Sequence, residues 1–102
     1  MEAQADKSSL GFVELPGLTN AIAVLDIMLK AAAITFVTWE KKLGGRLVTI
    51  VVKGSIANVT AAVDAAKQSA DIKSALVIAA PHPETWKMVR ISAKKYTTLA
   101  SS

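Results

Sequence analysis

Apolar residues recur along this chain either at every second position, as in a strand, or every three to four positions, as in a helix. The points where one spacing gives way to the other mark the boundaries of the expected elements. Residues 10–15 (LGFVEL) have the alternation of a short strand. After the turn signal Pro16-Gly17, apolar residues return at helical spacing and predict a helix over 18–32. Residues 34–42 and 47–53 are rich in β-branched and aromatic residues, so we expect two strands joined through Gly44-Gly45.

The second half of the chain repeats this order. Ser55 is suited to cap a helix over 56–70, residues 75–80 (ALVIAA) predict a last strand, and Pro83 opens a short helix through Val89. Strand–helix–strand twice over predicts an α+β chain with the ferredoxin-like split βαβ fold: a four-stranded antiparallel sheet with helices packed on it, plus a short C-terminal helix. We expect a flexible leader (1–9), one domain (10–89) and a partly mobile C-terminal tail (90–102).

The helix predicted over 18–32 is apolar on two faces. One face carries Leu18, Ile22, Leu25, Leu29 and Ala32; the second carries Ala21, Val24 and Met28. The chain has 102 residues, 52% of them hydrophobic and 20% charged, and a domain this small buries only a modest share of its surface. We therefore expect one face to pack on the sheet. The second face, with the apolar strands around Trp39, would be covered by a neighbouring subunit.

Composition argues against several other classes of protein. The longest apolar stretch, 21–37, contains Asp26 and Lys30, so no membrane span is expected, and residues 1–9 lack the apolar region of a secretory signal. There is no cysteine, which excludes disulfides and thiolate metal sites. The net charge of +4 is modest, and the strand at 47–53 lacks the aromatic residues of an RNA-binding sheet. We expect no nucleic-acid partner, no metal and no cofactor.

Catalytic residues are not predicted either. The single histidine, His82, lies between Pro81 and Pro83, and nothing near it resembles a pair of nucleophile and base. The carboxylates are dispersed along the chain. The pair Gly44-Gly45 is followed by a strand and lacks the Lys-Ser/Thr of a phosphate-binding loop.

Five segments, in order and at the right spacing, resemble the motifs of the bacterial microcompartment (BMC) domain family. They are LGFVELPGL (10–18), DIMLKAA (26–32), WEKKLGGRLVTIVVKG (39–54), VTAAVDAAKQSA (59–70) and VIAAPHPE (77–84). The resemblance covers roughly residues 9–89 and is to the single-domain hexameric type. It implies a structural protein rather than an enzyme. Such proteins form cyclic homo-hexamers that tile with other shell proteins into the shell of a bacterial microcompartment in the cytoplasm. The shell encloses metabolic enzymes, and small metabolites cross it through a central pore.

The resemblance also implies two sets of site residues. The pore-lining set is Lys42, Leu43, Gly44, Gly45 and Arg46, and the hexamer-edge set is Lys30, Ala80, Pro81 and His82. Gly45 stands where the family often has serine, so we expect a wider opening lined by backbone, in which Lys42 favours anions or polar neutral solutes. Ala80 stands where the family usually has arginine, which predicts a weaker lattice of hexamers.

Two other functions compete with this one. The same fold serves small-ligand-binding or regulatory modules, which would respond to a ligand with a shift in stability. It also serves small acyl-phosphate hydrolases, but residues 16–20 lack the arginine that such an enzyme needs to bind its anion. A shell protein should run as a hexamer or larger in size-exclusion chromatography, whereas either rival could be a monomer or dimer. The resemblance does not select one type of microcompartment.

Overall fold

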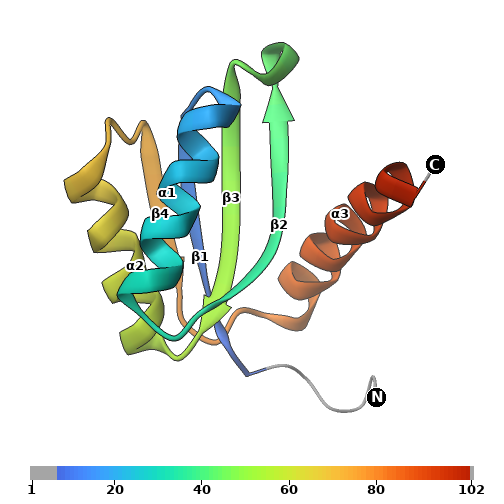
Figure 1. Ribbon diagram of the computed structural model, residues 1–102. Coiled ribbons are helices and arrows are strands. Elements are labelled where there is room, and N and C mark those ends of the chain that lie inside the picture. The colour runs from blue at the N-terminus through green and yellow to red at the C-terminus, as the bar shows by residue number, and fades with distance from the viewer. Residues whose placement is uncertain (1–6, 102) are drawn as a thin grey trace.

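The computed structural model describes residues 7–101 and places two helices on one face of a four-stranded sheet and a third helix on the other (Figure 1). The elements are β1 (Ser9–Pro16), α1 (Leu18–Ala31), β2 (Thr35–Lys42), the short 3-10 turn η1 (Leu43–Gly45), β3 (Leu47–Gly54), α2 (Ile56–Ser69), β4 (Ser74–Ile78) and α3 (Pro83–Ser101). All strand pairs are antiparallel, in the order β2-β3-β1-β4. The predicted fold class is therefore confirmed.

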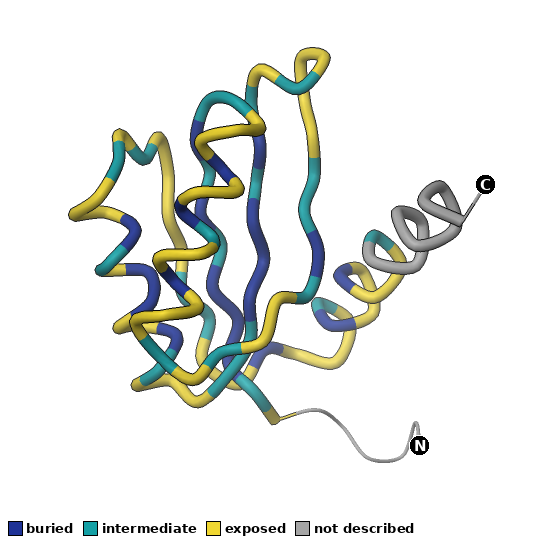
Figure 2. The backbone as a smooth tube through the Cα atoms, viewed as in Figure 1, coloured by how far each residue is buried: buried dark blue, intermediate teal, exposed yellow. Residues whose placement is uncertain are grey.

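The main core lies between the sheet and the pair α1 and α2. Because side chains alternate between the two faces of a strand, every second residue of β1 and β3 points at these helices. Figure 2 shows the result as dark, buried central strands. The buried members are Val13, Leu15, Val48, Ile50 and Val52 from the sheet, Ala21, Val24 and Met28 from α1, and Val59, Ala62, Val63 and Ala66 from α2.

We expected the wrong face of α1 to pack against the sheet. The face made by Ala21, Val24 and Met28, which we expected a neighbouring subunit to cover, is the one buried against the sheet. The larger residues of the other face remain accessible, and Ile22 is 61% exposed. Both faces have helical spacing, so periodicity alone could not decide between them.

A smaller core on the opposite face of the sheet holds α3 in place. It contains Leu10, Val51, Trp86 and Val89. The hydroxyl of Ser92 also donates a hydrogen bond to the carboxylate of Glu40 on β2. The helix continues to Ser101 instead of ending near residue 89, because no proline or glycine follows Pro83 to stop it.

Other boundaries differ from the prediction by a few residues. Strand β4 ends at Ile78, because Ala80 adopts a left-handed backbone (φ +46°) that cannot continue a strand. Of the predicted leader, residues 1–6 lie outside the described residues, and Ser9 is already a buried residue of β1. The predicted cap of α2 is present: the hydroxyl of Ser55 accepts a hydrogen bond from the backbone N–H of Asn58 at 3.1 Å.

Candidate functional site

The turn between β2 and β3 brings the five predicted pore-lining residues together at one end of the sheet. Three successive residues have left-handed backbones: Leu43 (φ +55°), Gly44 (φ +67°) and Gly45 (φ +92°). Glycine adopts this conformation freely, whereas for a residue such as leucine it costs roughly 1–2 kcal/mol. The Leu43 side chain is nevertheless 68% exposed at the tip of the turn.

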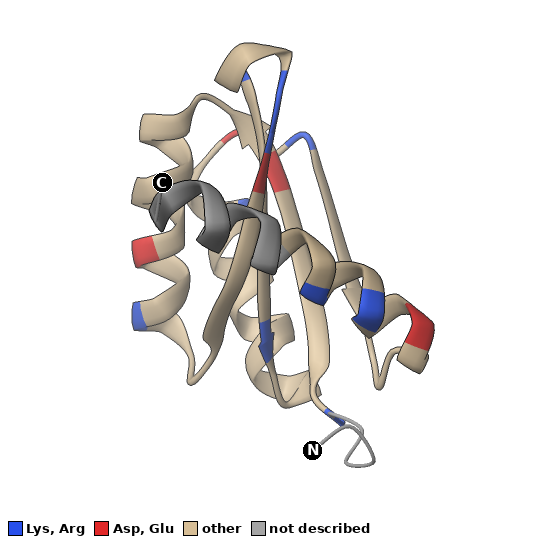
Figure 3. Cartoon of the chain, turned by 90° about the vertical axis from the view of Figure 1, so that its right-hand side faces the viewer, with Lys and Arg blue, Asp and Glu red and all other residues tan. Residues whose placement is uncertain are grey.

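Two of the cations beside this turn, Lys42 and Arg46, have the following partners within the protomer. The ammonium of Lys42 lies 3.5 Å from Oε2 of Glu14, an oxygen that also accepts a hydrogen bond from the Thr49 hydroxyl at 3.1 Å. Basic and acidic segments accordingly lie near one another on the strands below the turn (Figure 3). The Nε–H of Arg46 donates to the carbonyl oxygen of Leu43 at 3.3 Å. Neither cation extends freely from the tip.

The predicted edge residues lie at the other end of the sheet. Helix α1 begins beside the turn, because Pro16 pairs with Leu47 and the Gly17 N–H donates to the Arg46 carbonyl oxygen at 3.1 Å. It runs the length of the sheet and ends before β2, which places Lys30 far from the turn (Figure 1). Residues 79–82 follow the end of β4, where Ile78 pairs with Leu10, so they share the end of the sheet at which α1 finishes.

Lys30 is bound within its own helix. Its ammonium lies 2.8 Å from Oδ2 of Asp26, and both side chains are mostly exposed. The hydrogen bond from Lys30 to Asp26 and the negative charge of that carboxylate raise the pKa of Lys30 above its ordinary value.

The residues around Ala80 shape the backbone that leads into α3. Pro81 is buried, and His82 is exposed. The Nδ1 atom of His82 accepts a hydrogen bond from the Glu84 N–H at 3.0 Å, and its carbonyl oxygen accepts from the N–H of Thr85 at 2.9 Å. His82 thus caps the first turn of α3.

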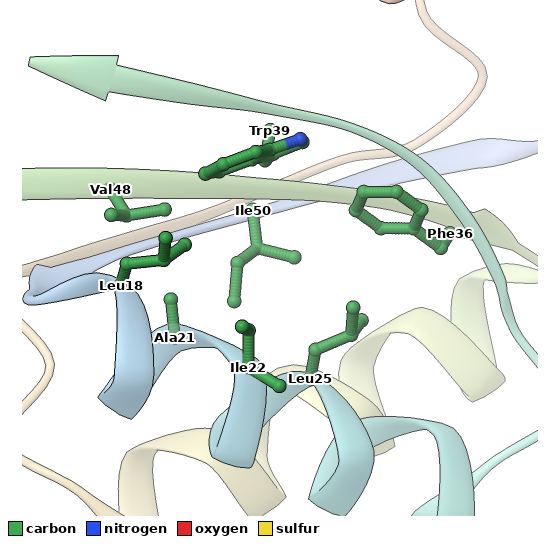
Figure 4. A pocket seen from close by; sticks show the side chains of 8 residues that line it. All are labelled: Leu18, Ala21, Ile22, Leu25, Phe36, Trp39, Val48 and Ile50. Carbon is green, nitrogen blue, oxygen red and sulfur yellow. The ribbon is translucent and has the colours of Figure 1, made fainter. Parts of the chain in front are cut away.

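An apolar groove that the sequence did not predict opens between α1 and β2. It has a volume of about 320 Å³ (Figure 4). A bulge at residue 37 of β2 turns Phe36 and Trp39 to the same face of the sheet, although they are three residues apart. The groove is lined by Leu18, Ala21, Ile22, Leu25, Phe36, Trp39, Val48 and Ile50.

Residues 7–101 contain neither a cluster of metal-ligating side chains nor a helix able to cross a membrane. Within residues 7–101, no three or more histidine or carboxylate side chains gather as metal ligands would. No helix described there has the length and apolarity needed to cross a membrane.

Comparisons with known proteins agree on one family. The family model described as "BMC domain" matches residues 9–81. The bacterial microcompartment shell protein PduA of Citrobacter freundii is 39% identical over 87 residues, covering 81% of this chain and 92% of that protein. The microcompartment shell protein EutM of Salmonella typhimurium is 37% identical over 90 residues, covering 84% and 93%. The carboxysome shell protein CcmK2 of Thermosynechococcus vestitus is 38% identical over 80 residues, covering 72% and 78%.

A solved structure supports the fold. A microcompartment protein from Desulfitobacterium hafniense superposes with a TM-score of 0.73 at 21% identity. The match covers 85% of this chain and 49% of that one, so this chain spans about half the length of that protein.

Proposed function

This chain belongs to the BMC domain family and is a structural shell protein rather than an enzyme, and we propose that it works as a cyclic homo-hexamer with a central pore for small metabolites. Members of this family assemble with other shell proteins in the microcompartment shell. We propose further that the turn at residues 42–46 surrounds the pore and that Lys30 and residues 80–82 meet neighbouring hexamers. Enzymes enclosed by the shell would be further partners.

The observation that carries this proposal is the separation of the two sets of residues along the strands. The turn lies at one end of the sheet, and Lys30 and Ala80 lie near the other. In a ring whose protomers are arranged radially, one end must face the axis and the other the rim. The glycine turn suits the crowded axis because it lets backbones approach closely.

The sides of the protomer supply the contacts that a ring needs. A ring is closed by heterologous contacts, in which each subunit uses two different surfaces. One side carries the apolar groove beside β2. The opposite edge of the sheet is β4, where Leu76 is 54% exposed. We propose that the neighbouring subunit covers the groove, because an exposed apolar surface of this kind is stabilised by burial.

The groove also bears on the alternative of a small-ligand-binding module, since its volume suits a small molecule. A ligand site normally adds polar groups that orient the ligand, whereas the lining here is aliphatic and aromatic. Size-exclusion chromatography with light scattering separates the two functions. The shell proposal requires the mass of six protomers or more, and a stable monomer in dilute buffer would overturn it.

Substitution of Gly45 tests the pore. We expect Gly45→Asn to lower the passage of small solutes several-fold, because six added side chains then narrow the opening. The shells are built with this subunit as their pore-forming hexamer and enclose an enzyme. Passage is measured as the turnover rate of that enzyme in intact shells relative to its rate in opened shells. Gly17→Asn is the matched control, since Gly17 also has a positive φ but lies outside the predicted pore-lining set. Equal passage of solutes in wild type and Gly45→Asn shells would contradict the proposal that this turn surrounds the pore.

Substitution of Ala80 tests the edge. Arginine brings five N–H donors, where alanine brings none, so we expect Ala80→Arg hexamers to form flat sheets at a lower protein concentration than the wild type. Electron microscopy over a concentration series measures this, and Ala80→Met controls for side-chain length. The edge assignment is contradicted when the arginine and methionine variants assemble alike.

A further inference from the structure

Leu43 is held in an unfavourable state that the protomer alone does not explain. Its backbone is left-handed (φ +55°), and its side chain is 68% exposed. It belongs to neither of the two buried clusters in the described part of the chain. Backbone strain that persists without a local reason points to a functional role.

Leu43 is also the side chain that the tip of the turn presents. Gly44 and Gly45 have none, and the ammonium of Lys42 is drawn to Glu14 at 3.5 Å. The Arg46 side chain folds back to the Leu43 carbonyl oxygen at 3.3 Å. The Lys42 ammonium, which we expected to favour anions at the opening, is thus paired with Glu14, and the Arg46 side chain lies against the turn. An isobutyl group takes the exposed position.

We propose that six Leu43 side chains form an apolar collar around the opening, so that the pore passes uncharged small solutes in preference to small anions. The proposal rests on the proposed function, because it needs the turn to lie at the ring axis. An ion in an apolar constriction loses hydrogen bonds to water and gains no partner, whereas a neutral solute loses less. Leu43 would then determine the specificity of the pore.

Two three-carbon solutes test the collar. Shells are loaded with glycerol oxidase or with lactate oxidase, and oxygen uptake at low substrate concentration is compared between intact and opened shells. We expect glycerol to enter wild type shells several-fold faster than lactate, because an apolar constriction disfavours a charged solute. Leu43→Asn should reduce this ratio to about one, since asparagine tolerates the left-handed backbone and supplies polar groups. Leu43→Met, which keeps an apolar side chain, should preserve the ratio.

A second measurement separates failure of the collar from failure of the pore. The chain has no cysteine, so Leu43→Cys introduces a single thiol per protomer. A short bismaleimide should cross-link neighbouring copies of this variant within isolated hexamers. Hexamers without cross-links would place the turn away from the axis and overturn the pore itself. Cross-linked hexamers combined with equal ratios in the asparagine and methionine variants would overturn the collar alone.

Discussion

Replacing Ile22 by glutamate is expected to convert the proposed hexamer into folded single protomers. Ile22 lies at the rim of the apolar groove and is 61% exposed, so a carboxylate there stays hydrated in the protomer and leaves its core unchanged. In the ring the same carboxylate would be buried against a neighbour without a partner, at a cost of at least about 3 kcal/mol for each contact. Sedimentation or light scattering measures the loss of the ring, and circular dichroism verifies that the protomer remains folded.

Ile91 provides a matched control for this substitution. It is the same residue type with nearly the same exposure, 62%, but it lies on α3 at the opposite face of the sheet. Ile91→Glu should leave the hexamer intact. The reverse pattern, with Ile91→Glu monomeric and Ile22→Glu hexameric, would move the subunit interface from the groove to α3.

The fold could be predicted from the sequence because the spacing of apolar residues differs clearly between the strands and the helices. The boundaries between these elements are marked by turn and capping residues. Gly44-Gly45 separates β2 from β3, and Ser55 caps α2, and both are read from neighbouring residues. The alternation along β1 and β3 then specifies which side chains enter the core. The five predicted pore-lining residues could be placed in one turn for the same reason, since they are consecutive.

Features that depend on tertiary packing were not predictable. The sequence does not show the bulge at residue 37, and simple alternation would place Phe36 and Trp39 on opposite faces of the sheet. The groove could therefore not be anticipated. The buried face of α1 is likewise decided by where the helix lies over the sheet and beside α2, because both of its faces have helical spacing. The partners of Lys42 and Arg46 depend on the conformation of the turn, which the sequence LGG does not fix.

Gly11 is where we expect a single methyl group to have the largest effect on stability. It lies on β1 beneath α2, and an ideally placed Cβ would be 2.7 Å from Cγ1 of Val59 and 3.1 Å from Cγ2 of Val63. Its φ is not in the left-handed region, so the lack of space alone excludes a side chain. Overpacking of a core costs about 1–3 kcal/mol, which outweighs the 0.5–1 kcal/mol or so that alanine gains over glycine in a strand.

We therefore expect Gly11→Ala to lower the free energy of unfolding by about 1–2 kcal/mol, or the melting temperature by roughly 4–16 °C in a domain of this size. Urea unfolding in the monomeric Ile22→Glu background, at fixed protein concentration, measures it without the contribution of the ring. Val59→Ala removes the methyl group that a new Cβ would approach most closely, Cγ1 of Val59. The double variant Gly11→Ala, Val59→Ala should then be more stable than the sum of the single effects by about 1 kcal/mol. Additive effects would mean that α2 moves aside without strain, and that close contact between β1 and α2 does not fix the position of the helix.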